Sequence, residues 1–486
     1  MRKATEGIDY TSRDYQAYKQ LLIQKLQEKI PEYTDTSETD AGIAILESFA
    51  NGLDICSYYT DSIANDLVLA TTQDRKLACI LASNLGYTPY YQSASVIPLV
   101  FTLEDALEED YIIGKGTVVT TEETESEEPV YFETDDDLTI PAGCLGNEKD
   151  EGGNYIYTVL ASQGETVDDD YVGSSDGSAY QSFQTAYTEV LVDTLRVYVD
   201  EGDGETLWNR VDSFLDSEKE DKVYTVIIDE NDNCFIEFGN NIRGKIPTPY
   251  DNGIRCYYKT GGGEIGNVKE GTVTNLETEV AYVESVTNLE PVTLGHEKEP
   301  LEEIKYHAPA KWRTRDRAVT LVDYNDLILT NVSSHPEFYG ILNTNPLQDS
   351  SNKLKVNIYY QMKKGYTFTD ELQRSLDNFV SNRTIIGTSY EFFAYLPYTV
   401  NLVASVVTSS DYVREDVLKE VENYLKDEVF AYGNFTFEDE LLTSDLEQKV
   451  VQNVSGVKAF RITSPTDIVI KADSNGVITL GTITLN

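Results

Sequence analysis

Apolar side chains recur at three- and four-residue spacing over residues 11–86, and this period predicts helices. A capping box of Thr11 and Asp14 opens the first helix, and Pro31 ends it. The apolar stripe of this helix contains Tyr15, Tyr18, Leu22, Leu26 and Ile30.

A second helix is predicted behind a start signal at residues 36–40. One stripe holds Ile43, Leu46, Ala50, Leu53 and Ser57, and beside it lie Ile45, Phe49 and Cys56. Because this apolar surface is wide, we expect the helix to be covered on more than one side. A third helix ends at Gly86, where helices favour glycine, and Pro89 follows.

From about residue 93 the apolar period changes to two, which predicts strands. The clearest runs are residues 96–102, 117–121, 155–161, 195–199, 223–228 and 234–238. Acidic and glycine-rich stretches between them are expected to be loops, at residues 122–128, 135–137, 146–153 and 168–177. Residues 229–233 resemble a calcium loop, but Cys234 stands where an EF-hand needs glycine, so a hairpin turn is the better interpretation.

Helical spacing returns at residues 298–332, and after a break near 343–353 strands and helices alternate. This alternation suggests a split β-α-β, ferredoxin-like unit. The predicted fold class is therefore multidomain α+β. Its parts are an N-terminal helical domain (1–92), a central β-rich domain (93–295) with inserted loops at about 101–222, a helical connector (296–345) and a C-terminal ferredoxin-like α/β oligomerisation domain (346–486).

The composition is strongly acidic, with 84 acidic and 38 basic residues and a net charge of −46. Nucleic acid is excluded as a natural partner, because duplex binding needs a basic surface, and an anionic membrane surface is disfavoured too. The N-terminus lacks the apolar stretch of a signal peptide, and no apolar run of about 18 residues occurs. We therefore expect synthesis and folding in the cytoplasm, with the five widely spaced cysteines reduced.

Motifs that carry chemistry are absent from the sequence. His296, His307 and His335 match no metal-ligand spacing. The run Gly261–Gly263 follows a strand, but no amphipathic helix opens after it, which indicates a turn instead of a nucleotide site. Carboxylate pairs are inevitable in so acidic a chain and do not identify a glycosidase. We expect a protein that is not an enzyme and holds no cofactor or metal.

Three stretches carry a resemblance to a known family. The first runs from Asp40-Ala41-Gly42 to Leu85-Gly86-Tyr87-Thr88-Pro89, the second from Phe238-Gly239 through Gly244 and Pro247 to Gly266-Asn267-Val268, and the third from Ala308 through Arg317-Ala318-Val319-Thr320 to Asp323-Tyr324. In this order they resemble the baseplate J-like family of contractile phage tails and related injection particles. Asn240 and Asn241 depart from the family's Asp-Gly, but asparagine tolerates a positive φ, so the turn can be kept.

The resemblance implies a structural wedge subunit of a tail baseplate. Two copies would associate within a wedge, and wedges would form a sixfold ring around the central hub, in contact with other wedge subunits and sheath-proximal proteins. Such a ring would couple baseplate rearrangement to sheath contraction. The alternative is a receptor-binding adhesin of the tail tip, favoured by the tyrosine-rich β region, and a third possibility is a wall-degrading hydrolase.

Candidate subunit-interface residues are Arg313, Arg317, Asp323, Tyr324, Val417, Val421 and Leu425. The arginines are expected to pair with carboxylates, either within the chain or across a subunit boundary. For the stripe at residues 417–425, both packing beneath a sheet and a homodimer seam remain open.

Overall fold

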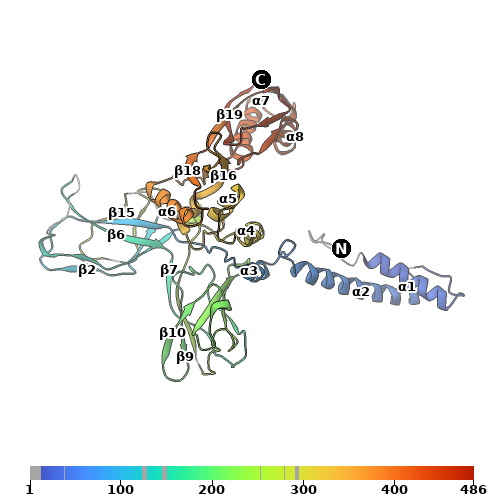
Figure 1. Cartoon of the computed structure of the whole chain (residues 1–486), viewed down its shortest axis with the longest axis horizontal. Coiled ribbons are helices and arrows are strands. Elements are labelled where there is room, and N and C mark those ends of the chain that lie inside the picture. Colours follow the sequence, from blue (N-terminus) through green and yellow to red (C-terminus); the bar gives the residue numbers. More distant parts are fainter. Residues whose placement is uncertain are drawn as a thin grey trace. The chain divides into compact units, whose positions relative to one another are not determined.

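The computed structural model describes residues 13–37, 39–122, 128–144, 149, 152–251, 253–278, 280–289 and 295–486. The chain divides into two compact units, Met1–Tyr306 and His307–Asn486 (Figure 1). The predicted mixture of N-terminal helices and a β-rich body is confirmed. Among the described helices, none combines the length and the apolar character that a membrane crossing requires.

The first unit begins with a hairpin of two helices, α1 (Tyr15–Lys29) and α2 (Ala41–Asp66), which lie side by side (Figure 1). Asp14 caps α1 by accepting from the Ala17 amide at 2.9 Å, whereas the predicted partner Thr11 lies outside the described residues. Asp40 caps α2 in the same manner. The capping carboxylates therefore fix where both helices begin.

Only one face of α2 is used against α1. The buried side chains of α2 are Ile43, Ala50, Ser57, Asp61 and Asn65. A hydrogen bond of 2.6 Å joins the Tyr18 and Ser57 hydroxyls, and Lys19 pairs with Glu47 at 2.6 Å. The opposite face of α2, which the sequence predicts to be covered as well, is open in the single chain.

Helix α3 (Arg75–Ser83) leads into two sheets. The six-stranded sheet has the order β14 (Val273–Leu276), β3 (Val118–Thr121), β4 (Tyr131–Thr134), β6 (Tyr155–Gln163), β1 (Val96–Leu103) and β15 (Ser285–Asn288). A two-stranded sheet of β2 (Tyr111–Ile113) and β5 (Leu138–Ile140) packs its Ile113 and Ile140 into the same core as Phe101 and Phe132.

The seven-stranded sheet has the order β7 (Glu165–Gly173), β13 (Ile254–Thr260), β9 (Arg196–Asp200), β10 (Glu205–Arg210), β11 (Val223–Ile228), β12 (Cys234–Phe238) and β8 (Ser182–Gln184). Its core holds Trp208 and Phe238 edge to face, with ring centroids 5.2 Å apart. The β11–β12 hairpin confirms the predicted turn at residues 229–233. The predicted loop at 168–177 is wrong for residues 168–173, because β7 pairs with β13 there in spite of its acidic side chains.

Short 3₁₀ turns connect these elements: η1 (Ala142–Cys144), η2 (Phe214–Asp216), η3 (Glu264–Gly266) and, in the second unit, η4 (Pro336–Gly340). Lys259 on β13 joins the two large sheets, because its ammonium lies 3.3 Å from Glu133 on β4 and 3.5 Å from Asp135. The five cysteines form no disulfide.

Helix α4 (Leu301–Thr314) crosses the boundary between the units. The second unit continues with α5 (Leu321–Leu329) and a three-stranded sheet of β16 (Ile341–Gln348), β17 (Lys355–Met362) and β18 (Ser389–Ala394), with α6 (Asp370–Ser381) between the last two strands. A second three-stranded sheet contains β21 (Val457–Ser464), β19 (Leu396–Thr408) and β23 (Gly476–Leu485).

The remaining elements of this unit are α7 (Arg414–Tyr424), the π-turn η5 (Leu425–Val429), β20 (Glu440–Leu442), α8 (Thr443–Asn453) and β22 (Val469–Lys471). The strands predicted to form one ferredoxin-like sheet belong instead to two sheets, so a ferredoxin-like unit is not confirmed. β17 and β18 pair in parallel in one sheet, while β19 pairs with β21 in the other.

Candidate functional site

A buried carboxylate, Glu299, anchors the end of α3 to the segment before α4. Gly86 ends α3 with a φ of +76°, which turns the chain so that Tyr87 points inward. The Tyr87 hydroxyl donates to both carboxylate oxygens of Glu299, at 2.7 and 2.8 Å, and the Tyr90 amide donates to one of them at 3.2 Å. Arg75 donates to the Glu299 carbonyl oxygen. Burial, and then the charge of Glu299, hold the pKa of Tyr87 well above its usual range.

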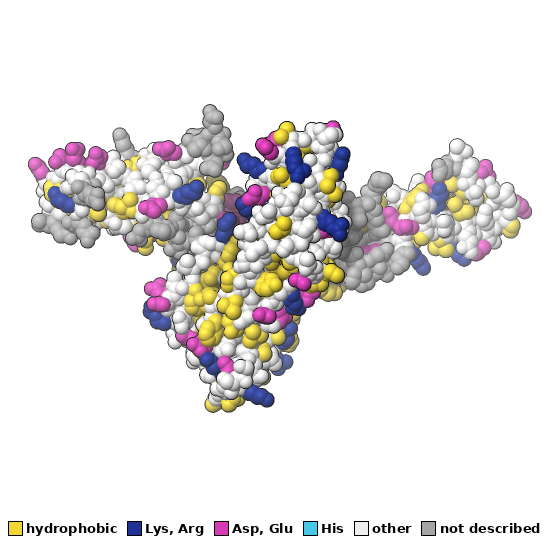
Figure 2. Space-filling model, turned by 90° about the horizontal axis from the view of Figure 1, so that it is seen from above, with side chains coloured by type: hydrophobic (Ala, Val, Ile, Leu, Met, Phe, Trp, Pro, Cys, Tyr) yellow, Lys and Arg dark blue, Asp and Glu magenta, His cyan; other side chains and the backbone are white. Residues whose placement is uncertain are grey.

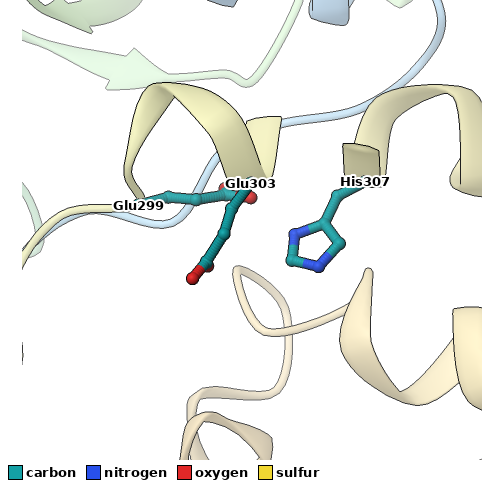
Figure 3. A group of neighbouring side chains, drawn as sticks. All are labelled: Glu299, Glu303 and His307. Carbon is teal, nitrogen blue, oxygen red and sulfur yellow. The ribbon is translucent and has the colours of Figure 1, made fainter. Parts of the chain in front are cut away.

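Glu303 and His307 follow Glu299 at intervals of one helical turn (Figure 3). Each of the three side chains offers one possible metal-ligand atom, and these atoms lie within 4.8 Å of one another. However, the Tyr90 hydroxyl donates to Glu303 at 2.9 Å, and Tyr87 with Tyr90 already use Glu299. Hydrogen bonds thus account for the positions of Glu299 and Glu303, and we assign these two carboxylates as an anchor.

Helix α3 and the residues that follow it are also attached to the β11–β12 hairpin. The Tyr91 hydroxyl donates to the Val226 carbonyl oxygen at 2.9 Å. Lys76 lies 3.4 Å from Glu237 and 4.1 Å from the centre of the Phe235 ring. Because these contacts join residues more than a hundred positions apart, they hold α3 against the seven-stranded sheet.

A groove of about 400 Å³ lies between α3 and this sheet. Its lining includes Tyr87 and Pro89 from the first motif and Asn240 and Arg243 from the second, so the two motifs meet here. Cys79 also lines the groove, and burial raises the pKa of its thiol to about 11. Burial thus keeps this thiol largely protonated, and the groove marks the junction between α3 and the seven-stranded sheet.

The second motif is a tight turn beside a buried ring. Phe238 is fully buried against Trp208, and a Cβ on Gly239 would lie 2.4 Å from the carbonyl oxygens of Arg243 and Gly244. Gly244 has a φ of +73°. Glycine is required at position 239 because no side chain fits between these oxygens.

The two asparagines keep the turn closed. Asn240 accepts from the amides of Ile242 and Arg243 at 2.9 and 2.8 Å. Asn241 has a φ of +60° and accepts from the Ile246 amide at 3.0 Å, so the expectation that asparagine preserves the turn is confirmed.

The rest of the second motif ties loops together. Ser175 donates to the Pro247 carbonyl oxygen at 2.5 Å, and Ser95 to that of Gly266 at 2.6 Å. Asn267 and Gly295 exchange two hydrogen bonds, at 2.8 and 3.0 Å. These hydrogen bonds join loops of the same chain to one another.

The third motif lies in the second unit, and only part of it is at the surface. Asp323 accepts from the amides of Val319 and Thr320 at 3.0 and 2.7 Å, which fixes the start of α5. Asp323 and Tyr324 are both buried. Their assignment to a subunit interface is therefore corrected: they belong to the fold of the single chain.

The two arginines of the third motif remain exposed. Arg313 pairs with the buried carboxylate of Asp326, whereas the guanidinium of Arg317 meets no acidic partner within the described part of the chain. Pairing within the chain thus applies to Arg313 alone.

Val417, Val421 and Leu425 are buried in the core of the sheet that contains β19, together with Leu446 and Val450 of α8. Of the two alternatives for this stripe, the structure shows the first, which is packing beneath a sheet. The side chains are unavailable at the surface of the chain, so their assignment to an interface is also corrected.

The sequence interpretation missed the group of Glu299, Glu303 and His307. One signal was available, since the three polar residues recur every four positions along a predicted helix, which places them on one face. Their partners Tyr87 and Tyr90 are more than two hundred residues away, and no local pattern predicts that contact.

Two family models match parts of the chain. Residues 14–82 match the model described as "Bacteriophage baseplate protein, N-terminal domain", and residues 399–486 match "Baseplate J-like protein C-terminal domain". No curated protein matches the chain.

Two solved baseplate structures are similar. One is the six-fold symmetrised anti-feeding prophage (AFP) baseplate, with 11% identity over 98% of this chain and 95% of that chain and a TM-score of 0.42. The other is the TssK-TssF-TssG baseplate subcomplex of the type VI secretion system, with 8% identity over 72% of this chain and 96% of that chain and a TM-score of 0.37.

Proposed function

We propose that this chain, a baseplate protein of a phage or phage-like particle, is a structural wedge subunit of a contractile tail. Two copies would share a wedge with other wedge subunits, and six wedges would surround the central hub, close to the sheath. The particle would assemble in the host cytoplasm. We propose a structural role without catalysis, in which the interfaces hold the ring and rearrange when the sheath contracts.

One observation carries this proposal: the open face of α2 has the spacing of a coiled-coil seam. Ile45, Phe49, Gly52, Cys56, Tyr59 and Ile63 alternate at four- and three-residue intervals, and all are exposed. We call these six residues the heptad stripe. Hydrophobic side chains are visible on the surface of this hairpin at the right-hand end of Figure 2.

A seam of this period packs best against another helix, whose side chains insert between those of the stripe. Its large side chains are 59–62% exposed, at Ile45, Phe49, Tyr59 and Ile63. Burying each of them would contribute on the order of 1–2 kcal/mol. The exposed Gly52 has no atom within 4 Å of its Cβ position, which leaves room for a partner helix to approach closely. We therefore propose helices of neighbouring wedge subunits as the occupants.

Localising a tagged chain by electron microscopy on purified particles tests the proposal. Label in a ring at the end of the tail, where tube and sheath meet, is expected. Label on distal fibres would favour the adhesin, and lysis of cell-wall material by the purified chain would contradict a purely structural role.

A matched pair of variants tests the heptad stripe itself. Phe49→Asp should abolish incorporation into particles, while Ser48→Asp, which changes an exposed residue next to the stripe, should leave incorporation unchanged. Equal incorporation of both variants would remove the stripe from the proposal.

A further inference from the structure

A second apolar surface lies in the unit His307–Asn486. Five large side chains are exposed there: Val319 (59%), Leu321 (38%), Val322 (53%), Ile385 (49%) and Ile386 (101%). We call these five residues the α5 patch. A parallel bridge between Ala318 and Thr384 brings its two segments together, and the Ala318 amide donates to the Arg383 carbonyl oxygen at 2.9 Å.

The α5 patch is held in shape by an ion pair and by hydrogen bonds of the same unit. The Arg383 guanidinium lies 2.8 Å from Asp316, which ties the turn after α6 to the turn before α5. Asp323 fixes the first turn of α5 through the amides of Val319 and Thr320. The exposed side chains therefore stand on a supported backbone, as a docking surface requires.

The edge of the patch is basic in a chain that is otherwise acidic. Residues 311–322 contain four cationic side chains, Lys311, Arg313, Arg315 and Arg317, and the single acidic residue Asp316, whereas the whole chain has a net charge of −46. Arg315 lies 5.7 Å from the centre of the exposed Trp312 ring, and the Arg317 guanidinium meets no acidic partner among the described residues. The positive charge of Arg317 is thus available to pair with a carboxylate of a partner.

We infer that the α5 patch docks on an acidic surface of a second copy of this chain. Two copies of net charge −46 repel each other over most of their surfaces, and the attraction is concentrated where arginines gather. Guanidinium groups pair readily with carboxylates across an interface, while the apolar residues supply the area that is removed from water.

Charge also selects the geometry of the pair. A symmetric contact of patch against patch would oppose Arg315 and Arg317 to their own copies, which is unfavourable. The contact is therefore head to tail, with the patch of one copy on a different, acidic face of the next. Such contacts continue from copy to copy and suit a ring. The inference deepens the proposed function, because it adds a contact between copies that is separate from the heptad stripe.

Sedimentation velocity of the full chain at physiological and at high salt tests the inference. Self-association is expected at physiological ionic strength, where repulsion between the acidic copies beyond about 8–10 Å is screened while close pairs of arginine and carboxylate persist. It should weaken at high salt, where the close pairs are screened as well. Ile386→Asp and Arg317→Glu should each weaken it about tenfold or more. Both residues are exposed, so neither change removes a core contact.

The matched control is Ile242→Asp, since Ile242 is also an exposed isoleucine in a turn next to an arginine. It should leave association unchanged. A parental chain that stays monomeric at physiological salt, or equal association of Ile386→Asp and Ile242→Asp, would overturn the inference.

The Phe49→Asp background separates this contact from the heptad stripe. Association that persists there and still responds to salt and to Ile386→Asp belongs to the α5 patch. If Phe49→Asp abolishes all association, the patch inference fails while the proposed wedge role stands. If Phe49→Asp particles form normally but Ile386→Asp prevents association, the stripe fails and the patch stands.

Discussion

Replacing Tyr87 with phenylalanine removes one hydroxyl from the anchor and leaves the ring in place. That hydroxyl donates to both oxygens of Glu299, whose side chain is fully buried. A hydrogen bond to a charged group stabilises a protein by about 1.5–3 kcal/mol. The Tyr90 amide still donates to Glu299, so the carboxylate keeps one partner and a larger loss is not expected. Tyr87→Phe should therefore lower the free energy of opening this junction by about 1.5–3 kcal/mol.

Cys79 reports the opening directly. It lines the groove beside Tyr87 and is half-buried, and burial raises the pKa of its thiol to about 11, so its alkylation should be slow in the closed junction and faster when the junction opens. Cys56 is exposed and should be replaced by serine in all variants, while Cys144, Cys234 and Cys256 are buried. The expected loss of stability raises the part of the alkylation rate that requires opening by about 10- to 150-fold. Peptide mapping by mass spectrometry identifies the labelled residue.

The control for this experiment is Tyr282→Phe. Tyr282 is exposed, and its recorded contact is with the Tyr111 ring, at 5.4 Å between centroids, which phenylalanine can keep. This variant should label at the parental rate. If Tyr87→Phe also labels at the parental rate, the hydrogen bonds to Glu299 do not hold the junction closed, and the anchor assignment is refuted.

Three further changes test other parts of the fold. Gly239→Ala should destabilise the β-rich domain by about 3 kcal/mol, because its Cβ would meet carbonyl oxygens at 2.4 Å, whereas Gly114→Ala, with open space around its Cβ, should have little effect in thermal unfolding. Burial alone would raise the pKa of Glu201, but hydrogen bonds from Lys245 and neighbouring donors lower it to about 2. The folded pKa lies below the ordinary value, so Glu201→Gln should cost about 1–2 kcal/mol at neutral pH, because solvent screens part of the interaction with the lysines. Urea titrations should show this difference disappear as pH falls from about 4.5 to 2. Val421→Asp puts a charge into a fully buried position and should lower the free energy of unfolding by more than about 4 kcal/mol. Limited proteolysis should then cleave rapidly within residues 399–486, and unchanged resistance to the protease would contradict this prediction.

Local patterns predicted most elements of the fold, because each is set by residues close in sequence. The strands at residues 223–228 and 234–238 have the predicted bounds. It was harder to predict which strands share a sheet. A helix joins β17 to β18, but these two strands pair directly with each other, whereas a split β-α-β unit has another strand between them. In addition, β19 joins a separate sheet with β21 and β23. Which edges pair depends on contacts between distant residues, and periodicity does not record them.

The acidic composition of β7 led to a wrong prediction of a loop. Residues 168–170 are three successive aspartates, which is typical of a solvated loop, but the backbone of this segment pairs with β13. Asp170 is also buried, where it accepts from the Tyr258 hydroxyl at 2.6 Å. A strand tolerates such acidic residues when its edge is paired and its carboxylates find donors.

The motif residues and the exposed surfaces have different tasks. Phe238, Gly239 and Tyr87 are inside the fold, where they set the junction between α3 and the β-rich domain. The heptad stripe and the α5 patch consist of exposed side chains, although the stripe and Val319, Leu321 and Val322 lie within the stretches that carry the family resemblance. Changes at the buried motif residues should therefore act on stability, while changes at Phe49 or Ile386 should act on association and leave unfolding unaltered. Selection of partners would then depend on surface residues that can vary while the junction stays constant, which is how one fold can serve in different assemblies.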